Sequence, residues 1–153
     1  MERTLILIKP DALQRGLVGE VTTRLEKKGL KLVGNKMMNL SEELLLEHYA
    51  HIADKPFFPG VKEFMMSTPV IAQCWEGAEV VETVRLICGI TNARKADAGT
   101  IRGDLSMSLQ SNIVHASDSL ETAIVEVPRF FEKDELFEWN MTRIQHLYAD
   151  GET

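Results

Sequence analysis

The sequence predicts an α+β fold built on an antiparallel sheet in ferredoxin-like β-α-β-β-α-β order, with helices on one face and added helices. Three observations support this prediction. Short apolar runs alternate with amphipathic helical stretches in that order. No repeat, low-complexity tract or linker interrupts the chain. Its length of 153 residues also suits one core, so we assign residues 1–153 to a single domain.

The first half of the sheet follows from two strand-like runs and the helix between them. Residues 4–8 form a leucine-rich and β-branched run that ends before Pro10, as expected of a buried strand. From Val18 to Lys28 apolar residues recur at helical spacing, and Gly29 supplies a stop signal, which predicts an amphipathic helix. Residues 30–40 alternate unevenly between apolar and polar and are predicted as the second strand.

A second helix is predicted after Ser41, a good N-cap that is followed by two glutamates favoured by the helix dipole. It runs to about residue 51, and the Pro-Phe-Phe-Pro-Gly stretch at 56–60 breaks it. The elements predicted next are a short helix at 61–66, a strand at 69–75 and a helix at 78–88.

The last third of the chain begins with a long connection, residues 89–103, that shows no clear period. Connections of this length within compact domains usually serve a function. The elements predicted after it are a strand at 113–115, a helix capped by Ser117 or Asp118 that runs to about Val127 and ends at Pro128, and a partly helical tail at 133–148.

The charge balance limits the classes of partner. With 23 acidic and 17 basic residues the net charge is −6, so the chain lacks the basic face of a general nucleic-acid or anionic-membrane binder. A few arginines in one cleft could still bind a small anion.

No apolar run is long enough for a signal-peptide core or a membrane span. Cys74 and Cys88 lie in apolar surroundings without metal-ligand spacing, so we expect reduced core cysteines and a cytoplasmic protein.

His115 is the histidine whose position indicates chemistry. It lies at the exit of a short apolar strand, just before a predicted helix N-terminus, where backbone N–H groups and the helix dipole attract phosphates. A lone histidine in such a place is more often structural, so this position alone does not decide its role. His48, His51 and His146 lie on predicted helices among charged neighbours and are interpreted as solvated surface residues.

Three cationic side chains are candidates for holding an anion. Arg102 lies in a glycine-flanked stretch, Arg85 lies in the helix that leads into the long connection, and Lys9 ends a strand immediately before a proline. Arginine forks match phosphate oxygens, although surface salt bridges explain the two arginines equally well. The sequence contains no Walker-type loop, Gly-x-Gly-x-x-Gly, metal-ligand spacing or Gly-x-Ser-x-Gly elbow. A nucleotide would therefore need scattered cations and an aromatic platform such as Phe57.

The segment around His115 resembles the active-site signature of nucleoside diphosphate kinases, and the likeness extends from Arg3 to about Leu147. The segment reads Asn112-Ile113-Val114-His115-Ala116-Ser117-Asp118-Ser119. The other motifs that resemble this family, in the same order along the chain, are Thr4–Asp11, Gln14–Gly19, Glu47–Tyr49, Pro56–Phe58, Thr91-Asn92 and Gly99–Asp104.

The resemblance implies a phosphotransferase that moves the γ-phosphate of a nucleoside triphosphate, mainly ATP, to a nucleoside diphosphate by a ping-pong mechanism. His115 would carry the phosphate on Nδ1, and Glu126 would orient its imidazole. Tyr49 and Ser117 would support the site. The nucleotides, which include ATP, GTP and GDP, would be bound by Lys9, Phe57, Val61, Arg85, Thr91, Arg102 and Asn112, of which Phe57 would stack on the base and Lys9 and Asn112 would also serve catalysis.

The resemblance further implies that Mg²⁺ arrives on the nucleotide phosphates and needs no protein ligands. It also implies a homo-oligomer, and the aromatic-rich tail matches hexameric members better than tetrameric ones. No membrane and no specific nucleic acid is expected as a partner. Three residues depart from the family pattern: Ala116 and Ala12 replace glycines, and Ile90 replaces a frequent acidic residue.

Two rival interpretations remain open at this point. A regulatory protein that has lost catalysis would be expected to lack His115 or one of the arginines, and the sequence retains them. A nucleic-acid-binding module would need a cluster of lysines and arginines, which the acidic sequence lacks.

Overall fold

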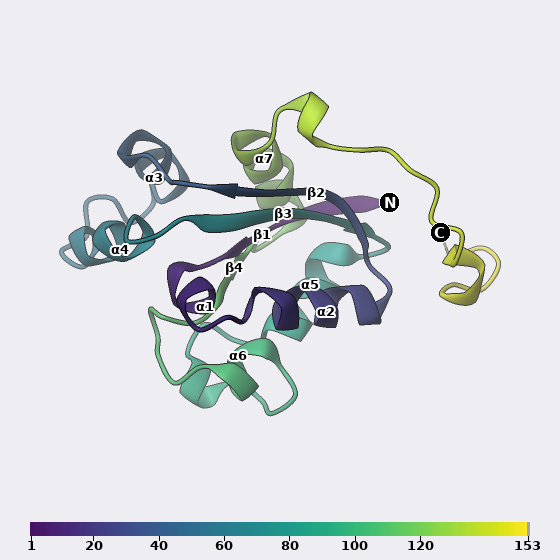
Figure 1. Ribbon diagram of the computed structural model, residues 1–153, viewed down its shortest axis with the longest axis horizontal. Helices are drawn as coiled ribbons and strands as arrows, with labels where there is room; N and C mark the ends of the chain where they lie inside the picture. The colour runs from purple at the N-terminus through teal and green to yellow at the C-terminus, as the bar shows by residue number, and fades with distance from the viewer. Residues whose placement is uncertain (153) are drawn as a thin grey trace.

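The computed structural model describes residues 1–152 and contains a four-stranded antiparallel sheet with strand order β2-β3-β1-β4 (Figure 1). Along the chain, helix α2 lies between β1 and β2, and helix α5 lies between β3 and β4. This order confirms the predicted β-α-β-β-α-β arrangement. The bounds of these elements are β1 Glu2–Ile8, α2 Val18–Lys28, β2 Lys31–Met38, β3 Val70–Gly77, α5 Val80–Cys88 and β4 Val114–Ala116.

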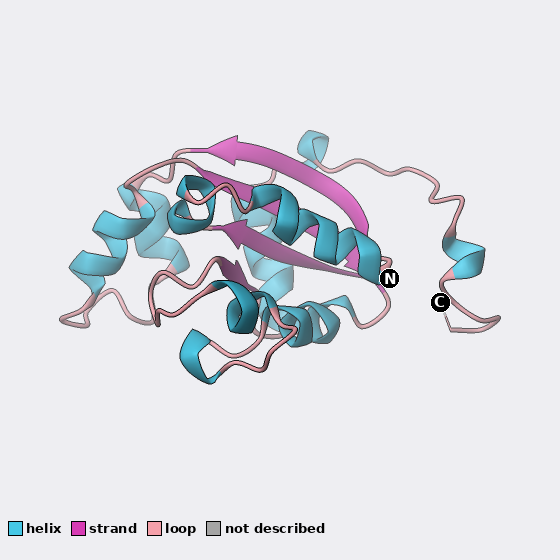
Figure 2. Ribbon diagram, turned by 60° about the horizontal axis from the view of Figure 1, so that its bottom comes forward, coloured by secondary structure: helices cyan, strands magenta, loops and turns pink. Residues whose placement is uncertain are grey.

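Strand β1 lies at the centre of the fold, because its alternating side chains feed two separate cores. Ile6 and Ile8 pack with residues of α2 and α5 on one face of the sheet. Leu5 and Leu7 pack on the other face with residues of the added helices. Figure 2 shows helices in front of and behind the sheet. The apolar run read from the sequence is therefore a strand buried on both faces.

The added helices extend the fold beyond the β-α-β-β-α-β unit. Leu45 of α3, Met65 of α4 and Val127 of α7 belong to the core on the face opposite α2 and α5. The remaining elements are α1 Pro10–Gln14, α3 Glu42–His48, α4 Phe58–Met65, α6 Ile101–Leu105 and α7 Leu120–Phe130, with 3₁₀ turns at Ala93–Lys95, Lys133–Glu135 and Ile144–His146. Within residues 1–152 no helix is both long and apolar enough to cross a membrane.

The predicted bounds of the last helix were wrong at both ends. Ser119, and not Ser117 or Asp118, caps α7, and its side chain accepts a hydrogen bond from the backbone N–H of Thr122. Pro128 lies inside the helix instead of ending it. The proline removes one backbone donor, but burial of Phe130 in the core outweighs that loss and keeps the last turn helical.

Two shorter helices also differ from the prediction. Helix α4 begins at Phe58, because Pro59 lies in its first turn, where a proline lacks only an N–H that would be unpaired anyway. The long connection contains α6, which was not predicted. Its N-cap, Thr100, accepts a hydrogen bond from the N–H of Gly103. Both misses come from reading Pro and Gly as breaks where they help to start a helix.

Candidate active site

A three-residue turn places His115 on the short strand β4. The N–H of Val114 donates to the carbonyl of Asn112 at 2.9 Å, and Ile113 between them has a φ of 76°. A buried β-branched residue in this left-handed region is strained, so neighbouring contacts must hold it. The carboxylate of Asp11 accepts from the N–H of Ile113 at 3.0 Å, and the N–H of Lys9 donates to its carbonyl at 2.9 Å. These contacts hold the turn at residues 112–114, which leads into β4.

The register of β4 decides which face of the sheet receives the imidazole. His115 pairs with Leu7 of β1, whose side chain lies on the face covered by α3 and α7. Its neighbours Val114 and Ala116 point to the opposite core. Strand alternation therefore directs His115 toward side chains of α3 and α7.

Glu126 of α7 holds the imidazole in one orientation. Its Oε2 lies 3.1 Å from Nε2 of His115 and accepts a second hydrogen bond, at 2.8 Å, from the hydroxyl of Ser117. Ser117 is fully buried, and its oxygen accepts from the N–H of Leu5 at 3.3 Å. A carboxylate only accepts, so Nε2 of His115 carries the proton and Nδ1 keeps its lone pair. The resemblance assigned Glu126 to orienting this imidazole and Ser117 to supporting the site, and both side chains lie beside the histidine.

The ionisation of Glu126 suits this role. Burial alone would raise the pKa of the Glu126 carboxyl, but the hydrogen bond and charge of His115, with contributions from His48 and Ser117, hold that pKa below its usual value. Glu126 is therefore a carboxylate at neutral pH and can compensate positive charge that develops on His115.

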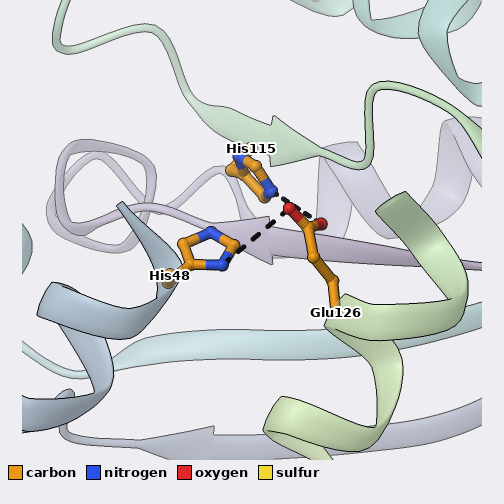
Figure 3. A group of neighbouring side chains, drawn as sticks. All are labelled: His48, His115 and Glu126. Atoms are coloured by element: carbon orange, nitrogen blue, oxygen red, sulfur yellow. Dashed lines mark hydrogen bonds and ion pairs between the residues drawn. The ribbon is translucent and has the colours of Figure 1, made fainter. Parts of the chain in front are cut away.

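The surface interpretation of His48 was wrong. Its side chain is 1% exposed, and its ring centroid lies 4.5 Å from that of His115 (Figure 3). Burial, followed by the charge of His115, lowers the pKa of His48 to about 3. The signal that could have found it is helical spacing, because His48 shares the buried face of α3 with Leu45, three residues earlier. His51 and His146 are exposed, as expected.

A second network joins Lys9 to Asn112. The ammonium of Lys9 donates to Oδ1 of Asn112 at 2.7 Å, and the amide of Asn112 donates to the carbonyl of Thr91 at 2.9 Å. Burial, with a smaller effect from the nearby Arg102, lowers the pKa of Lys9 to about 8. A bound anion would restore the charged form, because it would supply the compensation that the buried lysine lacks.

The side chain of Arg102 is held by backbone carbonyls around the site. Its guanidinium donates to the carbonyls of Val114, Gly89 and Asn112 at 2.6, 2.7 and 3.2 Å. The residue is 9% exposed, so its guanidinium is a fixed cation and not the surface salt bridge that the sequence also allowed. Arg85, by contrast, pairs with the exposed Asp118 at 2.7 Å and matches the surface salt bridge that the sequence also allowed.

One cavity of about 920 Å³ brings most of the predicted site residues together. His115, Lys9 and Arg102 lie in its wall, and Phe57, which is 56% exposed, also lines it. Ser117 does not line the cavity and acts from behind through Glu126. The other predicted residues in its wall are Tyr49, Val61, Arg85, Thr91, Asn112 and Glu126.

Tyr49 lies beside the histidines without a hydrogen bond to either. Its ring centroid is 6.4 Å from that of His115 and 4.8 Å from that of His48. Burial and the charge of Glu126 raise the pKa of Tyr49 to about 12, so its hydroxyl remains a neutral donor.

Sequence reasoning missed Asp11, which holds the strained turn, and Arg129, whose guanidinium contacts His48.

Comparison with known proteins matches this arrangement to one family. The family model described as nucleoside diphosphate kinase matches residues 2–136. A nucleoside diphosphate kinase of Parabacteroides distasonis is 55% identical over 152 residues, which cover 99% of each chain. One of Heliobacterium modesticaldum is 49% identical over 93% of this chain and 95% of its own.

Solved structures agree over the same length. A halophilic nucleoside diphosphate kinase from Halobacterium salinarum, solved in complex with CDP, has a TM-score of 0.94 at 47% identity and covers 97% of this chain and 99% of its own. A nucleoside diphosphate kinase family protein from Babesia bovis has a TM-score of 0.93 at 40% identity, covering 97% and 100%. The chain described here belongs to the nucleoside diphosphate kinase family of phosphotransferases.

Proposed function

We propose that this chain transfers the γ-phosphate of a nucleoside triphosphate, mainly ATP, to a nucleoside diphosphate through a phosphohistidine on Nδ1 of His115. One observation carries the proposal. Glu126 binds the Nε2–H of His115 and leaves Nδ1 unprotonated, in a cavity that is also lined by Lys9, Arg85 and Arg102. A neutral imidazole is a good nucleophile near pH 7, and cations compensate the charge of the phosphates.

The reaction then proceeds as two matched displacements. The Nδ1 lone pair of His115 attacks the γ-phosphorus, the bond to the β-phosphate oxygen breaks, and the nucleoside diphosphate leaves. Nε2 keeps its proton throughout, and the carboxylate of Glu126 compensates the positive charge that forms on the ring. A second nucleoside diphosphate attacks the phosphohistidine and returns the ring to its neutral form. The N–P bond retains a high transfer potential, which a nearly balanced exchange requires.

Positioning and charge supply most of the catalysis in such a transfer. Lys9, Arg85 and Arg102 are assigned to the phosphates, and Asn112 and Thr91 to phosphate and ribose oxygens. Tyr49, with its neutral hydroxyl, is assigned a supporting role beside the nucleophile. Arg85 would exchange its exposed partner Asp118 for the phosphates when a nucleotide enters.

The base would stack on Phe57 with Val61 beside it. Both residues line the cavity, and Phe57 presents an exposed ring. A ring that meets only the π-face of a base does not read its edge, so ATP, GTP, GDP and other nucleotides should all be accepted.

Magnesium fits this site as an ion that is coordinated by the nucleotide phosphates and not by protein side chains. Four carboxylates line the cavity: Glu126 is engaged by His115 and Ser117, Asp118 by Arg85 and Glu47 by Arg129, and Glu121 is the fourth. One remaining carboxylate does not make an oxygen cage, which suits an ion that keeps several waters and binds phosphate oxygens. When bound, the ion would neutralise charge on the β- and γ-phosphates, while Lys9 and the arginines hold the remaining oxygens.

The setting of the enzyme completes the proposal. We assign residues 1–153 to one functional domain in a cytoplasmic homo-oligomer, with a hexamer favoured over a tetramer. Two buried cysteines without a disulfide support a reducing compartment. Several large apolar side chains remain exposed on the single chain, as expected of a protein that buries more surface on assembly. Neither a membrane nor a specific nucleic acid is proposed as a partner.

Incubation with ATP labelled in its γ-phosphate tests the function directly. The purified protein should acquire a label that is lost in acid and retained in alkali, as a phosphohistidine is. The label should leave the protein when unlabelled GDP is added and appear in GTP. A protein that stays unlabelled, or a label that is stable in acid, contradicts the proposal.

A further inference from the structure

His48 is a buried histidine that the proposed reaction does not use. It comes from α3, whereas His115 comes from β4 and Glu126 from α7, and the three side chains converge at the wall of the cavity (Figure 3). The planes of the two imidazoles meet at 78°, so the rings pack edge to face. Phe130 contacts His48 from another side at 5.0 Å between ring centroids. This packing leaves His48 little freedom to move.

The hydrogen-bond partners fix the proton on His48. Nη1 of Arg129 lies 3.3 Å from Nδ1 of His48, and a guanidinium only donates, so Nδ1 must accept. The ring proton therefore resides on Nε2. Because the pKa of His48 is lowered to about 3, the ring is neutral at physiological pH. The approach of Oε1 of Glu126 to Nδ1, at 3.9 Å, is then neither a hydrogen bond nor an ion pair.

The Nε2–H of His48 has no conventional acceptor. The atom is buried and makes no hydrogen bond to any of residues 1–152. In Figure 3 the edge of the ring that carries Nε2 is turned toward the imidazole of His115. An N–H directed at an aromatic face forms a weak hydrogen bond, which would partly satisfy this otherwise unpaired donor.

We propose that His48 is a positioning residue for His115, holding the nucleophilic ring from its face while Glu126 holds it in its plane. The inference rests on the proposed function and adds a second constraint to the same ring. Glu126 alone fixes one atom, Nε2, about which the imidazole can still tilt. The Nε2–H of His48, which is directed at the face of the His115 ring, opposes that tilt and keeps Nδ1 aligned for attack on phosphorus.

The rate of phosphoenzyme formation in a single turnover with ATP tests this role. His48→Phe keeps a flat ring but removes the N–H, and we expect the rate to fall about tenfold, about 1.4 kcal/mol. The KM for the acceptor nucleotide should change by less than about twofold, because His48 contacts no proposed nucleotide ligand. His48→Gln restores an amide N–H and should recover part of the rate. His146→Phe, a substitution on the exposed tail, is the matched control and should leave the rate unchanged.

Ring ¹⁵N NMR signals of His115 provide a readout that packing alone would not move. The wild type should show one tautomer with the proton on Nε2, and His48→Phe should show a weaker or exchange-averaged Nε2–H signal, because the freed ring tilts out of its hydrogen bond to Glu126. An unchanged rate and Nε2–H signal in His48→Phe would overturn the proposal. The proposal would also be overturned if His48→Phe and His48→Gln lowered the rate of phosphoenzyme formation equally and this loss merely paralleled a drop in their thermal stability. A wild type that forms no phosphoenzyme would instead reject the proposed function, while the NMR signals would still test the positioning role.

Discussion

The two ends of the cavity are built on different principles. At the end proposed to bind the phosphates, His115 and Arg102 are held by hydrogen bonds to a buried carboxylate and to backbone carbonyls. At the end proposed to bind the base, Phe57 offers an exposed apolar ring that has no hydrogen-bonding group. The side chains at the proposed phosphate end are thus held in place by the fold itself, whereas the proposed base end offers an apolar surface. The proposed function therefore fixes the chemistry at one end and leaves the choice of nucleotide open at the other.

The largest effect should come from removing the nucleophile. His115→Ala should abolish labelling by ATP and lower the transfer rate by at least about a thousandfold, because the proposed covalent intermediate forms on this ring. Coupled measurement of GTP formation from ATP and GDP gives the rate. Transfer at the wild-type rate by this variant would mean that the phosphate does not pass through His115.

Substitutions of Arg102 test whether one side chain both contributes to phosphate transfer and stabilises the fold. Arg102→Ala should slow transfer about a hundredfold, as loss of a preorganised donor does. From the sequence alone, this substitution should leave the fold intact, but the three backbone carbonyls that Arg102 holds now predict a lower melting temperature as well. Arg102→Lys keeps the charge and should still lose stability, because an ammonium cannot span those carbonyls. Wild-type stability in both variants would contradict this account.

The buried lysine predicts a pH dependence of nucleotide capture. The pKa of Lys9 is lowered to about 8, so the fraction of charged Lys9 in the free enzyme falls as pH rises through that value. Because kcat/KM reports groups of the free enzyme, it should decline above about pH 8. Lys9→Arg, which stays charged, should shift the decline to higher pH. A profile that is the same in both proteins would exclude Lys9 as the titrating group.

The smallest effect is expected at the base end. Phe57→Ala should weaken nucleotide binding by about 1–2 kcal/mol, within the range for loss of one base stack, and by a similar amount for every base. Relative kcat/KM values for ATP, GTP, CTP and UTP measure this. A spread of more than about a hundredfold among these nucleotides in the wild type would show that the base edge is read after all.

Local patterns were sufficient to predict most of the fold. The helix Val18–Lys28 was predicted with the bounds it has, because its periodicity and its glycine stop are both local signals. Pro128 misled the prediction, since its effect depends on the buried Phe130, which no local pattern reveals. Tertiary packing overrode propensity there.

The candidate site was predictable where a signature resembles a known family, and much less so elsewhere. His115 and Glu126 lie eleven positions apart, and only the resemblance linked them before the structure did. The helical spacing of His48 from Leu45 marked a buried face, but the contacts of His48 with His115 and Phe130, far along the chain, could not be predicted from the sequence. The backbone contacts of Arg102 could not be predicted either, because no side-chain pattern in the sequence marks the carbonyls that it binds.

The strained turn at Ile113 makes the site a reporter of complete folding. The carboxylate that restrains this turn, Asp11, is separated from it by 102 positions in the chain. Loop closure over that distance is among the slow steps of folding, because its entropy must be lost before the contact contributes. A partly folded chain therefore has its histidine but lacks the contact between Asp11 and Ile113 that holds the turn before it. Under the proposed function, phosphate transfer would begin only once these two distant segments have met.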